Sequence, residues 1–334
     1  MRPGAVREAD VVVASCRAAA AFATGLRRAS ARLPKARGRA RFIDGVDYSF
    51  PDGEVGARLD AGVDGCDVFL LQSLVSPGAA GGVQEQALAL LVAARACREW
   101  GAARVTAVTP YLAYARQDKP TAGAREPTTA RLFADLAAAA GIDRLVTWHP
   151  HCAQVHGFFA PLPVVAPDPL DDFVHAFARF RGRGDAIAVA PDAGAAPLVG
   201  RFARALGLRS AVAMKRRPER GRAEITEIAG NFTGARVAIV LDDMISSGST
   251  LREVARALAA KTWVEEIRVA VSHNLCLREA RETLEELYHR GRLAAVSATD
   301  SIPQTEEFTR LSFFEVRPLA PRFAALVLAS VLLP

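Results

Sequence analysis

The sequence lacks the features that mark several classes of protein. Its five cysteines are odd in number and scattered, and none forms a CxxC pair. This pattern argues against a disulfide framework and a structural zinc site, and it fits a reducing cytoplasm. No uninterrupted apolar run is long enough to span a bilayer. No short-period repeat or low-complexity tract stands out, so the chain has the composition of a globular protein.

Acidic residues are missing from the stretch between Cys16 and Arg41, which is rich in Ala and Arg. Transit peptides share this composition. However, the run VVVAS at 11–15 predicts a strand, and the Ala-rich run after it predicts a helix. Folded structure with a solvated basic face is therefore favoured, with targeting as the alternative. The net charge of +6 fits anionic partners, either nucleic acid or phosphorylated metabolites.

The chain is long enough for two domains, with 334 residues of which 51% are apolar. Apolar runs alternate with helical patterns, which predicts parallel sheets covered by helices on both faces. We expect domains at 1–165 and 166–334, meeting near the Pro-rich stretch 160–169. Leu88, Leu91 and Val92 form an apolar stripe on the first long helix. The predicted strands are 11–15, 67–73, 104–109, 144–148, 185–190, 235–243 and 266–274, and the predicted helices are 84–101, 128–140, 197–207 and 250–260.

The segment LDDMISSGST, at 241–250, places two adjacent carboxylates before a run of hydroxyls and glycine. Ligands of parallel sheets bind beyond the carboxyl ends of strands, and a helix that begins near Thr250 would offer its positive end to an anion. Asp242 and Asp243 are suited to accept hydrogen bonds from a ribose diol, while the hydroxyls hold a phosphate. The pattern indicates a phosphorylated ribose, with a plain helix cap as the alternative.

Further motifs lie in collinear order along the chain: SFPDGEV (49–55), PYLAYARQDK (110–119), RLVTWHPHCAQVHGFF (144–159), VAPDAGA (189–195), MKRRPERGRAEI (214–225) and TDSIP (299–303). Together with 241–250 they resemble the ribose-phosphate pyrophosphokinases, or PRPP synthetases. Ordinary phosphoribosyltransferases share only the loop at 241–250. The resemblance implies an α/β protein with two similar phosphoribosyltransferase-like domains, each a mostly parallel sheet flanked by helices.

The resemblance also implies a reaction and the residues that perform it. A ribose-phosphate diphosphokinase moves the β,γ-diphosphoryl group of ATP onto the 1-hydroxyl of ribose 5-phosphate with the help of Mg²⁺, giving PRPP and AMP. Catalysis falls to Lys215 and Arg217 on a mobile loop, and metal binding to His151 and Asp192. The matching ATP positions are Phe50, Asp52, Glu54, Arg116, Gln117 and Lys119, with Asp118 completing the motif. The matching ribose 5-phosphate positions are Asp242, Asp243, Ser246, Ser247, Gly248, Ser249 and Thr250.

Each assignment has a plainer alternative. The basic run at 215–220 is a solvated loop in that reading, His151 is structural, Phe50 is a core residue, and Asp52-Gly53 is a turn. The run HPHC at 149–152 invites a zinc interpretation, although no second ligand cluster has zinc-finger spacing.

The chain also departs from the family pattern. Ser246 stands where the family has Asp, Ser247 where it has Thr, and Ser249 where it has Gly. Lys119 replaces Arg and loses the planar fork of guanidinium. The apolar C-terminus, RFAALVLASVLLP, predicts a packed helix or an oligomer contact, with membrane association as a third interpretation.

The expected partners are ATP and ribose 5-phosphate, with neither nucleic acid nor membrane. We expect a cytoplasmic homo-oligomer built from dimers, such as a hexamer, because 49–55 resembles a loop that completes a neighbour's site. Three alternatives stay open: a non-catalytic regulatory subunit, an enzyme acting on a related sugar phosphate, and a transferase that consumes PRPP.

Overall fold

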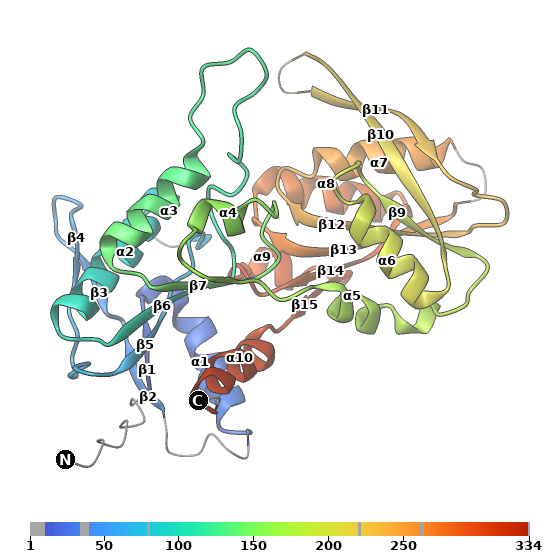
Figure 1. Cartoon of the computed structure of the whole chain (residues 1–334). Coiled ribbons are helices and arrows are strands. Elements are labelled where there is room, and N and C mark those ends of the chain that lie inside the picture. The colour runs from blue at the N-terminus through green and yellow to red at the C-terminus, as the bar shows by residue number, and fades with distance from the viewer. Residues whose placement is uncertain (1–10, 34–39, 79–80, 220–221, 261–263, 333–334) are drawn as a thin grey trace. The chain divides into compact units, whose positions relative to one another are not determined.

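The computed structural model describes residues 11–33, 40–78, 81–219, 222–260 and 264–332, and the chain divides into two compact units (Figure 1). Unit 1 comprises Met1–Pro167, Ser301–Pro303 and Pro318–Pro334, and unit 2 comprises Asp168–Asp300 and Gln304–Arg317. The first boundary falls in the Pro-rich stretch where a junction was predicted.

Unit 1 contains a parallel sheet with its described strands in the order β2-β1-β5-β6-β7-β8. Four of these strands fall on predicted apolar runs, whereas β2 and β8 were not predicted. The strands are β1 (Val11–Ser15), β2 (Ala40–Asp44), β5 (Asp67–Leu71), β6 (Arg104–Thr109), β7 (Arg144–Thr147) and β8 (Val164–Val165). A separate antiparallel hairpin pairs β3 (Asp47–Ser49) with β4 (Val55–Ala57).

Helices cover both faces of this sheet (Figure 1). On one face, α1 (Ala20–Ser30) and α10 (Ala320–Leu332) share a core with Phe69, Val108 and Val146. The other face carries α2 (Val83–Glu99) and α3 (Thr129–Ala140), followed in the chain by the short α4 (Val155–Phe159). The prediction of near-continuous apolar strands buried on both faces is therefore confirmed.

The apolar stripe predicted on α2 does not face the core. Leu88 is 48% exposed, and Leu91 and Val92 are only half-buried. The helix instead turns its small residues toward the sheet, because alanines allow the closest approach of a helix to neighbouring backbone. The buried residues of α2 are Gln86, Ala87, Ala89, Leu90, Ala93, Ala94 and Cys97.

Unit 2 contains a second sheet, with its described strands in the order β11-β10-β9-β12-β13-β14-β15. All neighbours are parallel except β10 and β11, which form an antiparallel hairpin at one end. The predicted runs correspond to β9, β12 and β13. The strands are β9 (Ala186–Ala190), β10 (Arg209–Glu219), β11 (Arg222–Ala229), β12 (Val237–Ile245), β13 (Glu266–Asn274), β14 (Leu293–Thr299) and β15 (Phe314–Arg317).

Two separate apolar cores cover the faces of the second sheet. One contains Phe173 of α5 (Leu170–Ala176) and Phe202 of α6 (Ala196–Leu206). The other contains Leu258 of α7 (Ser249–Ala259), Leu284 of α8 (Arg278–His289) and Phe308 of α9 (Glu306–Thr309). Each unit is thus an α/β layer structure with a mostly parallel sheet, which confirms the predicted fold class.

The C-terminal helix α10 packs in unit 1. The rings of Phe22 and Phe323 meet edge to face with centroids 5.3 Å apart, and a Cβ added to Gly25 would lie 3.1 Å from that of Ala320. This confirms the packed-helix interpretation and corrects the sequence-based division, which had placed residues 318–334 in the second domain. Within the described part of the chain, no helix is long and apolar enough to cross a membrane.

Candidate active site

In unit 2, the predicted sugar-phosphate segment joins strand β12 to helix α7. Because β12 pairs with β13 as far as Ile245, Asp242 and Asp243 lie within the strand rather than beyond it. Gly248 has a left-handed φ of 80°, and a Cβ at this position would lie 3.1 Å from Cβ of Thr283 and 3.3 Å from Cα of Ala280. The loop therefore needs glycine both for its backbone conformation and for its close approach to α8.

Hydroxyl groups and the start of a helix surround this turn. Ser246, Ser247 and Thr250 are half-buried, and Ser249 is exposed as the first residue of α7. The hydroxyl of Ser247 donates a hydrogen bond to that of Ser249 over 3.1 Å. The backbone N–H groups of the first turn of α7 have no acceptor within the helix, so the turn presents both hydroxyl and amide donors to an anion.

Asp192, just beyond the end of β9, lies near Asp242 and Asp243 in the last part of the adjacent strand β12. Asp243 donates its backbone N–H to Oδ1 of Asp242 over 2.9 Å, and Ala195 donates its N–H to Oδ1 of Asp192 over 3.2 Å. Burial raises the pKa of Asp242 well above its ordinary value, and the charges of Asp243 and Asp192 raise it further. The three carboxyl groups therefore lie close enough to influence one another's ionisation, and their oxygens can accept hydrogen bonds from hydroxyl groups of a ligand.

Carboxylate oxygens of the kind that magnesium prefers are present among these residues. Mg²⁺ prefers oxygen ligands and commonly takes one or two carboxylates, completing its shell with water and substrate phosphates. Asp192 and the Asp242–Asp243 pair supply such oxygens. Among the residues the structure describes, no group of three or more His, Cys, Asp or Glu side chains is placed to hold a metal ion, so substrate phosphates and water would have to complete such a site. The predicted second metal residue, His151, is exposed and belongs to unit 1.

In unit 1, the predicted adenine-binding residues lie at the tip of the β3–β4 hairpin. Phe50 is 45% exposed, which contradicts the alternative that it is a core residue. Its ring meets that of Tyr48 at 5.1 Å, and the turn is closed by Oδ1 of Asp52, which accepts the N–H of Glu54 over 3.1 Å. The hairpin thus holds an aromatic ring and two exposed acids toward solvent.

The base of the same hairpin is tied to the rest of unit 1. Arg17 donates its backbone N–H to Oδ1 of the buried Asp47 over 2.5 Å, and its Nε lies 3.2 Å from Oδ2 of the same carboxylate. The hydroxyl of Ser49 donates to Oε1 of Glu85 over 3.3 Å. These contacts fix the base of the hairpin against α2 and against the short 3-10 helix η1 (Arg17–Ala19) that precedes α1.

The other predicted ATP segment, 110–119, begins the long connection between β6 and α3 (Figure 1). Arg116, Gln117 and Lys119 are exposed. The ammonium group of Lys119 donates to Oδ2 of Asp118 over 3.2 Å, and the side chain of Asp118 is largely buried. The segment therefore presents a guanidinium, an amide and an ammonium group to solvent from a buried stem.

Residues 149–152 follow β7 and contact that segment. His149 has a positive φ of 39°, and Sγ of the half-buried Cys152 donates a weak hydrogen bond to the carbonyl of Ala115 over 3.6 Å. Burial raises the pKa of the Cys152 thiol. Among the described residues, no group of three or more His, Cys, Asp or Glu side chains is placed to hold a metal ion, which disfavours the zinc interpretation of the HPHC run.

Lys215 and Arg217 lie on β10, where a loop was expected. Strand β10 pairs with β11 in a hairpin, and a bulge falls between Met214 and Lys215. Beyond Val212, β10 no longer pairs with β9, so this part of the hairpin extends past the body of the sheet. The expectation of a loop is corrected to a two-stranded arm that carries both cations.

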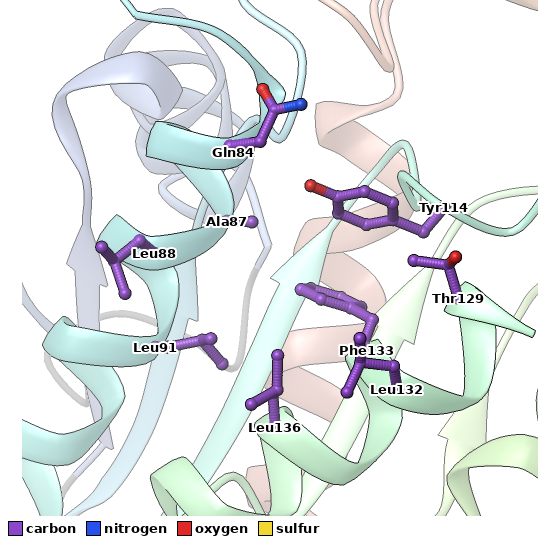
Figure 2. A pocket seen from close by; sticks show the side chains of 9 residues that line it. All are labelled: Gln84, Ala87, Leu88, Leu91, Tyr114, Thr129, Leu132, Phe133 and Leu136. Atoms are coloured by element: carbon purple, nitrogen blue, oxygen red, sulfur yellow. The ribbon is translucent and has the colours of Figure 1, made fainter. Parts of the chain in front are cut away.

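An apolar cavity of about 260 Å³ lies between α2 and α3 (Figure 2). Tyr114 and Thr129 belong to its wall, beside Phe133. Sequence reasoning missed both residues. Tyr114 has a left-handed φ of 65°, which is uncommon for a bulky side chain, and Thr129 contacts Gln117. The cavity is lined by Gln84, Ala87, Leu88, Leu91, Tyr114, Thr129, Leu132, Phe133 and Leu136.

Fold and site together define a two-unit α/β protein with a phosphoribosyltransferase-type loop. Comparison with known families and proteins agrees with this class. Residues 41–141 match the family model for the N-terminal domain of ribose phosphate pyrophosphokinase, and residues 178–296 match the phosphoribosyl transferase domain.

Similar proteins cover most of the chain. A ribose-phosphate pyrophosphokinase of Caldanaerobacter subterraneus subsp. tengcongensis is 36% identical over 289 residues, which is 86% of this chain and 87% of that protein. One from Clostridium perfringens is 37% identical over 277 residues, covering 81% and 82%. The crystal structure of phosphoribosylpyrophosphate synthetase from Mycobacterium smegmatis aligns with a TM-score of 0.83 at 27% identity, covering 96% of this chain and 98% of that one. The chain belongs to the ribose-phosphate pyrophosphokinase family.

Proposed function

We propose that this enzyme transfers the β,γ-diphosphoryl group of ATP to the 1-hydroxyl of ribose 5-phosphate and releases PRPP and AMP. The observation that carries the proposal is the sugar-phosphate site of unit 2. There, the Asp242–Asp243 pair precedes a hydroxyl-rich turn that opens helix α7. An acid pair suits a vicinal diol, and the turn suits a phosphate, so one segment recognises both ends of ribose 5-phosphate.

The roles of the chain's own groups follow from their chemistry. Ser246, Ser247 and Thr250, with the first N–H groups of α7, bind the 5-phosphate. Asp242 and Asp243 accept hydrogen bonds from the ribose diol and orient the sugar. Positioning the 1-hydroxyl in line with the β-phosphorus converts a bimolecular reaction into an effectively intramolecular one. Phosphoryl transfer depends mainly on such positioning and on neutralising the oxygens of the transferred group.

We propose that residues of unit 1 bind ATP. Phe50 offers a ring face to adenine, and Asp52 and Glu54 offer acceptors beside it. Arg116, Gln117 and Lys119 bind the rest of the nucleotide. Lys215 and Arg217, on the β10–β11 arm, neutralise the charge that develops on the diphosphoryl group as AMP leaves. The hydroxyl proton of the sugar is lost to solvent or to phosphate as the new O–P bond forms.

Magnesium is the cofactor we propose, held by Asp192 and by His151 with the substrate phosphates. When bound, it supplies charge neutralisation to the phosphoryl oxygens. The carboxylate of Asp192 supports this assignment, because Mg²⁺ prefers oxygen ligands. We further propose a homo-oligomer in the cytoplasm. The exposed tip of the β3–β4 hairpin and the scattered, half-buried or buried thiols support these two statements.

The diol assignment can be tested with an analogue of the sugar. We expect 2-deoxyribose 5-phosphate to react with a kcat/KM lower by about 5- to 150-fold, because loss of one hydrogen bond to a charged group costs about 1–3 kcal/mol. In the variant Asp243→Asn, the discrimination between the two sugars should shrink. Equal use of both sugars by the unmutated enzyme would show that the acid pair does not clamp the diol, and preference for another sugar phosphate would support the specialised alternative.

A further inference from the structure

The connection between β6 and α3 carries the amide of Gln117 on a firmly held backbone. Gln117 donates its backbone N–H to the carbonyl of Tyr114 over 2.9 Å, and its own carbonyl accepts the N–H of Ala130 over 3.3 Å. The ring of Tyr114 packs 5.6 Å from that of Phe133, in the middle of α3. A turn bond to Tyr114 and a bond from Ala130 of α3 thus hold the main chain at position 117, and Figure 2 shows the ring of Tyr114 beside that of Phe133.

The side chain of Gln117 is also held, although the residue is exposed. Thr129, the first residue of α3, donates its hydroxyl hydrogen to Oε1 of Gln117 over 2.5 Å. At the start of a helix, a threonine hydroxyl usually bonds to backbone N–H groups nearby. Thr128, the N-cap residue, makes no such side-chain capping bond, and Thr129 directs its hydroxyl across to Gln117 instead.

This bond holds the Gln117 side chain in one position beside the start of α3. A glutamine amide has one acceptor oxygen and one NH₂ group with two donors. With Oε1 occupied by the Thr129 hydroxyl, the Nε2 donors point to the opposite side. Without that bond, a surface glutamine would rotate freely and present oxygen or nitrogen alike, at the cost of side-chain entropy whenever a ligand required one of them.

We propose that Thr129 is a positioning residue for nucleotide binding, which restrains the Gln117 side chain so that its amide is already ordered for contact with ATP. The inference rests on the proposed assignment of Gln117 to ATP and assigns a role to a residue outside the sugar and metal sites. It also accounts for the left-handed backbone of Tyr114, because that conformation turns the chain so that residue 117 lies beside the start of α3.

The test compares two neighbouring threonines. Thr129→Val keeps the β-branched shape and removes the hydroxyl, and Thr128→Val makes the same change at a side chain that does not cap the helix. We expect Thr129→Val to raise KM for ATP by about tenfold, equivalent to about 1.4 kcal/mol, with kcat, KM for ribose 5-phosphate and melting temperature close to those of Thr128→Val. Thr129→Ser should restore KM for ATP to near the wild-type value.

A double-mutant cycle shows whether the effect passes through Gln117. In the Gln117→Ala background, Thr129→Val should have no further effect on ATP affinity. An undiminished effect there, or equal KM values for the two valine variants, would overturn the proposal. Calorimetric titration of each variant with Mg²⁺ and a non-hydrolysable ATP analogue gives the same comparison without turnover. Failure of the proposed reaction would then leave the comparison of affinities intact, whereas absence of nucleotide binding by the wild type would overturn the positioning role itself.

Discussion

Replacing Gly248 by alanine tests how tightly the sugar-phosphate turn is built. Two costs follow from the structure. The left-handed φ of 80° disfavours any residue with a Cβ by about 1–2 kcal/mol. The added methyl would also lie 3.1 Å from Cβ of Thr283 and 3.3 Å from backbone Cα of Ala280, and such overpacking costs about 1–3 kcal/mol.

Thr283 cannot easily move aside to accommodate that methyl. Its hydroxyl accepts a hydrogen bond from Nη2 of Arg252 over 2.7 Å and donates one to the carbonyl of Glu279 over 2.9 Å. A shift of the side chain would weaken both bonds, and a shift of α8 would disturb the core beneath it. We therefore expect Gly248→Ala to lose about 2–5 kcal/mol of unfolding free energy in total.

Gly234 supplies the matched control in the same unit. Its φ is also left-handed, at 69°, but a Cβ there would meet no atom within 4 Å. Gly234→Ala should therefore show only the conformational cost. The two variants should differ by about 1–3 kcal/mol, which is about 2–12 °C in Tm for a domain of this size, followed by far-ultraviolet circular dichroism. Gly248→Ala should also raise KM for ribose 5-phosphate, with KM for ATP unchanged. Equal melting of the two variants, with unchanged kinetics, would refute the close-approach argument.

Two further predictions concern charge. Lys215→Ala should lower kcat and kcat/KM together by about 10²–10³, because the charge that Lys215 is proposed to neutralise develops fully only in the transition state. An unchanged kcat with a raised KM for ATP would show that Lys215 only binds the substrate. Asp242→Asn should melt at a higher temperature than the wild type at about pH 8 and lose this advantage at about pH 4. The raised pKa means that the folded state holds a proton the unfolded chain has released, so stability falls as pH rises from 3.8 toward the raised value. If the difference in Tm between Asp242→Asn and the wild type did not change with pH, the raised pKa of Asp242 would be contradicted.

Much of the strand pattern could be predicted because parallel strands that are buried on both faces consist of nearly continuous runs of apolar residues. The strands β1, β6 and β13 match their predicted ranges. The sugar-phosphate segment could also be placed from sequence, because its carboxylates and hydroxyls are contiguous. Its end was misjudged by two residues, since backbone pairing with β13 continues through polar residues as far as Ile245.

Features set by distant parts of the chain could not be predicted. The apolar composition of α10 predicts burial, but both units have apolar cores, so the sequence does not say which unit the helix joins. The charged run that contains Lys215 is typical of a loop in sequence. It forms a strand in the structure because it pairs with β11. The bond from Thr129 to Gln117 joins residues whose proximity depends on the path of the whole β6–α3 connection.

The proposed transfer of the diphosphoryl group is tested most directly by following labelled ATP. The purified enzyme is incubated with Mg²⁺, ribose 5-phosphate and ATP labelled at the γ-phosphate, and the products are separated by anion exchange. If the proposed reaction is right, AMP release depends on ribose 5-phosphate, and one labelled PRPP forms for each AMP. Neither product forms when Mg²⁺ is chelated. Label in free phosphate with ADP as co-product, or no AMP above background with any nucleotide donor, would contradict it, and the second result would support the regulatory-subunit alternative.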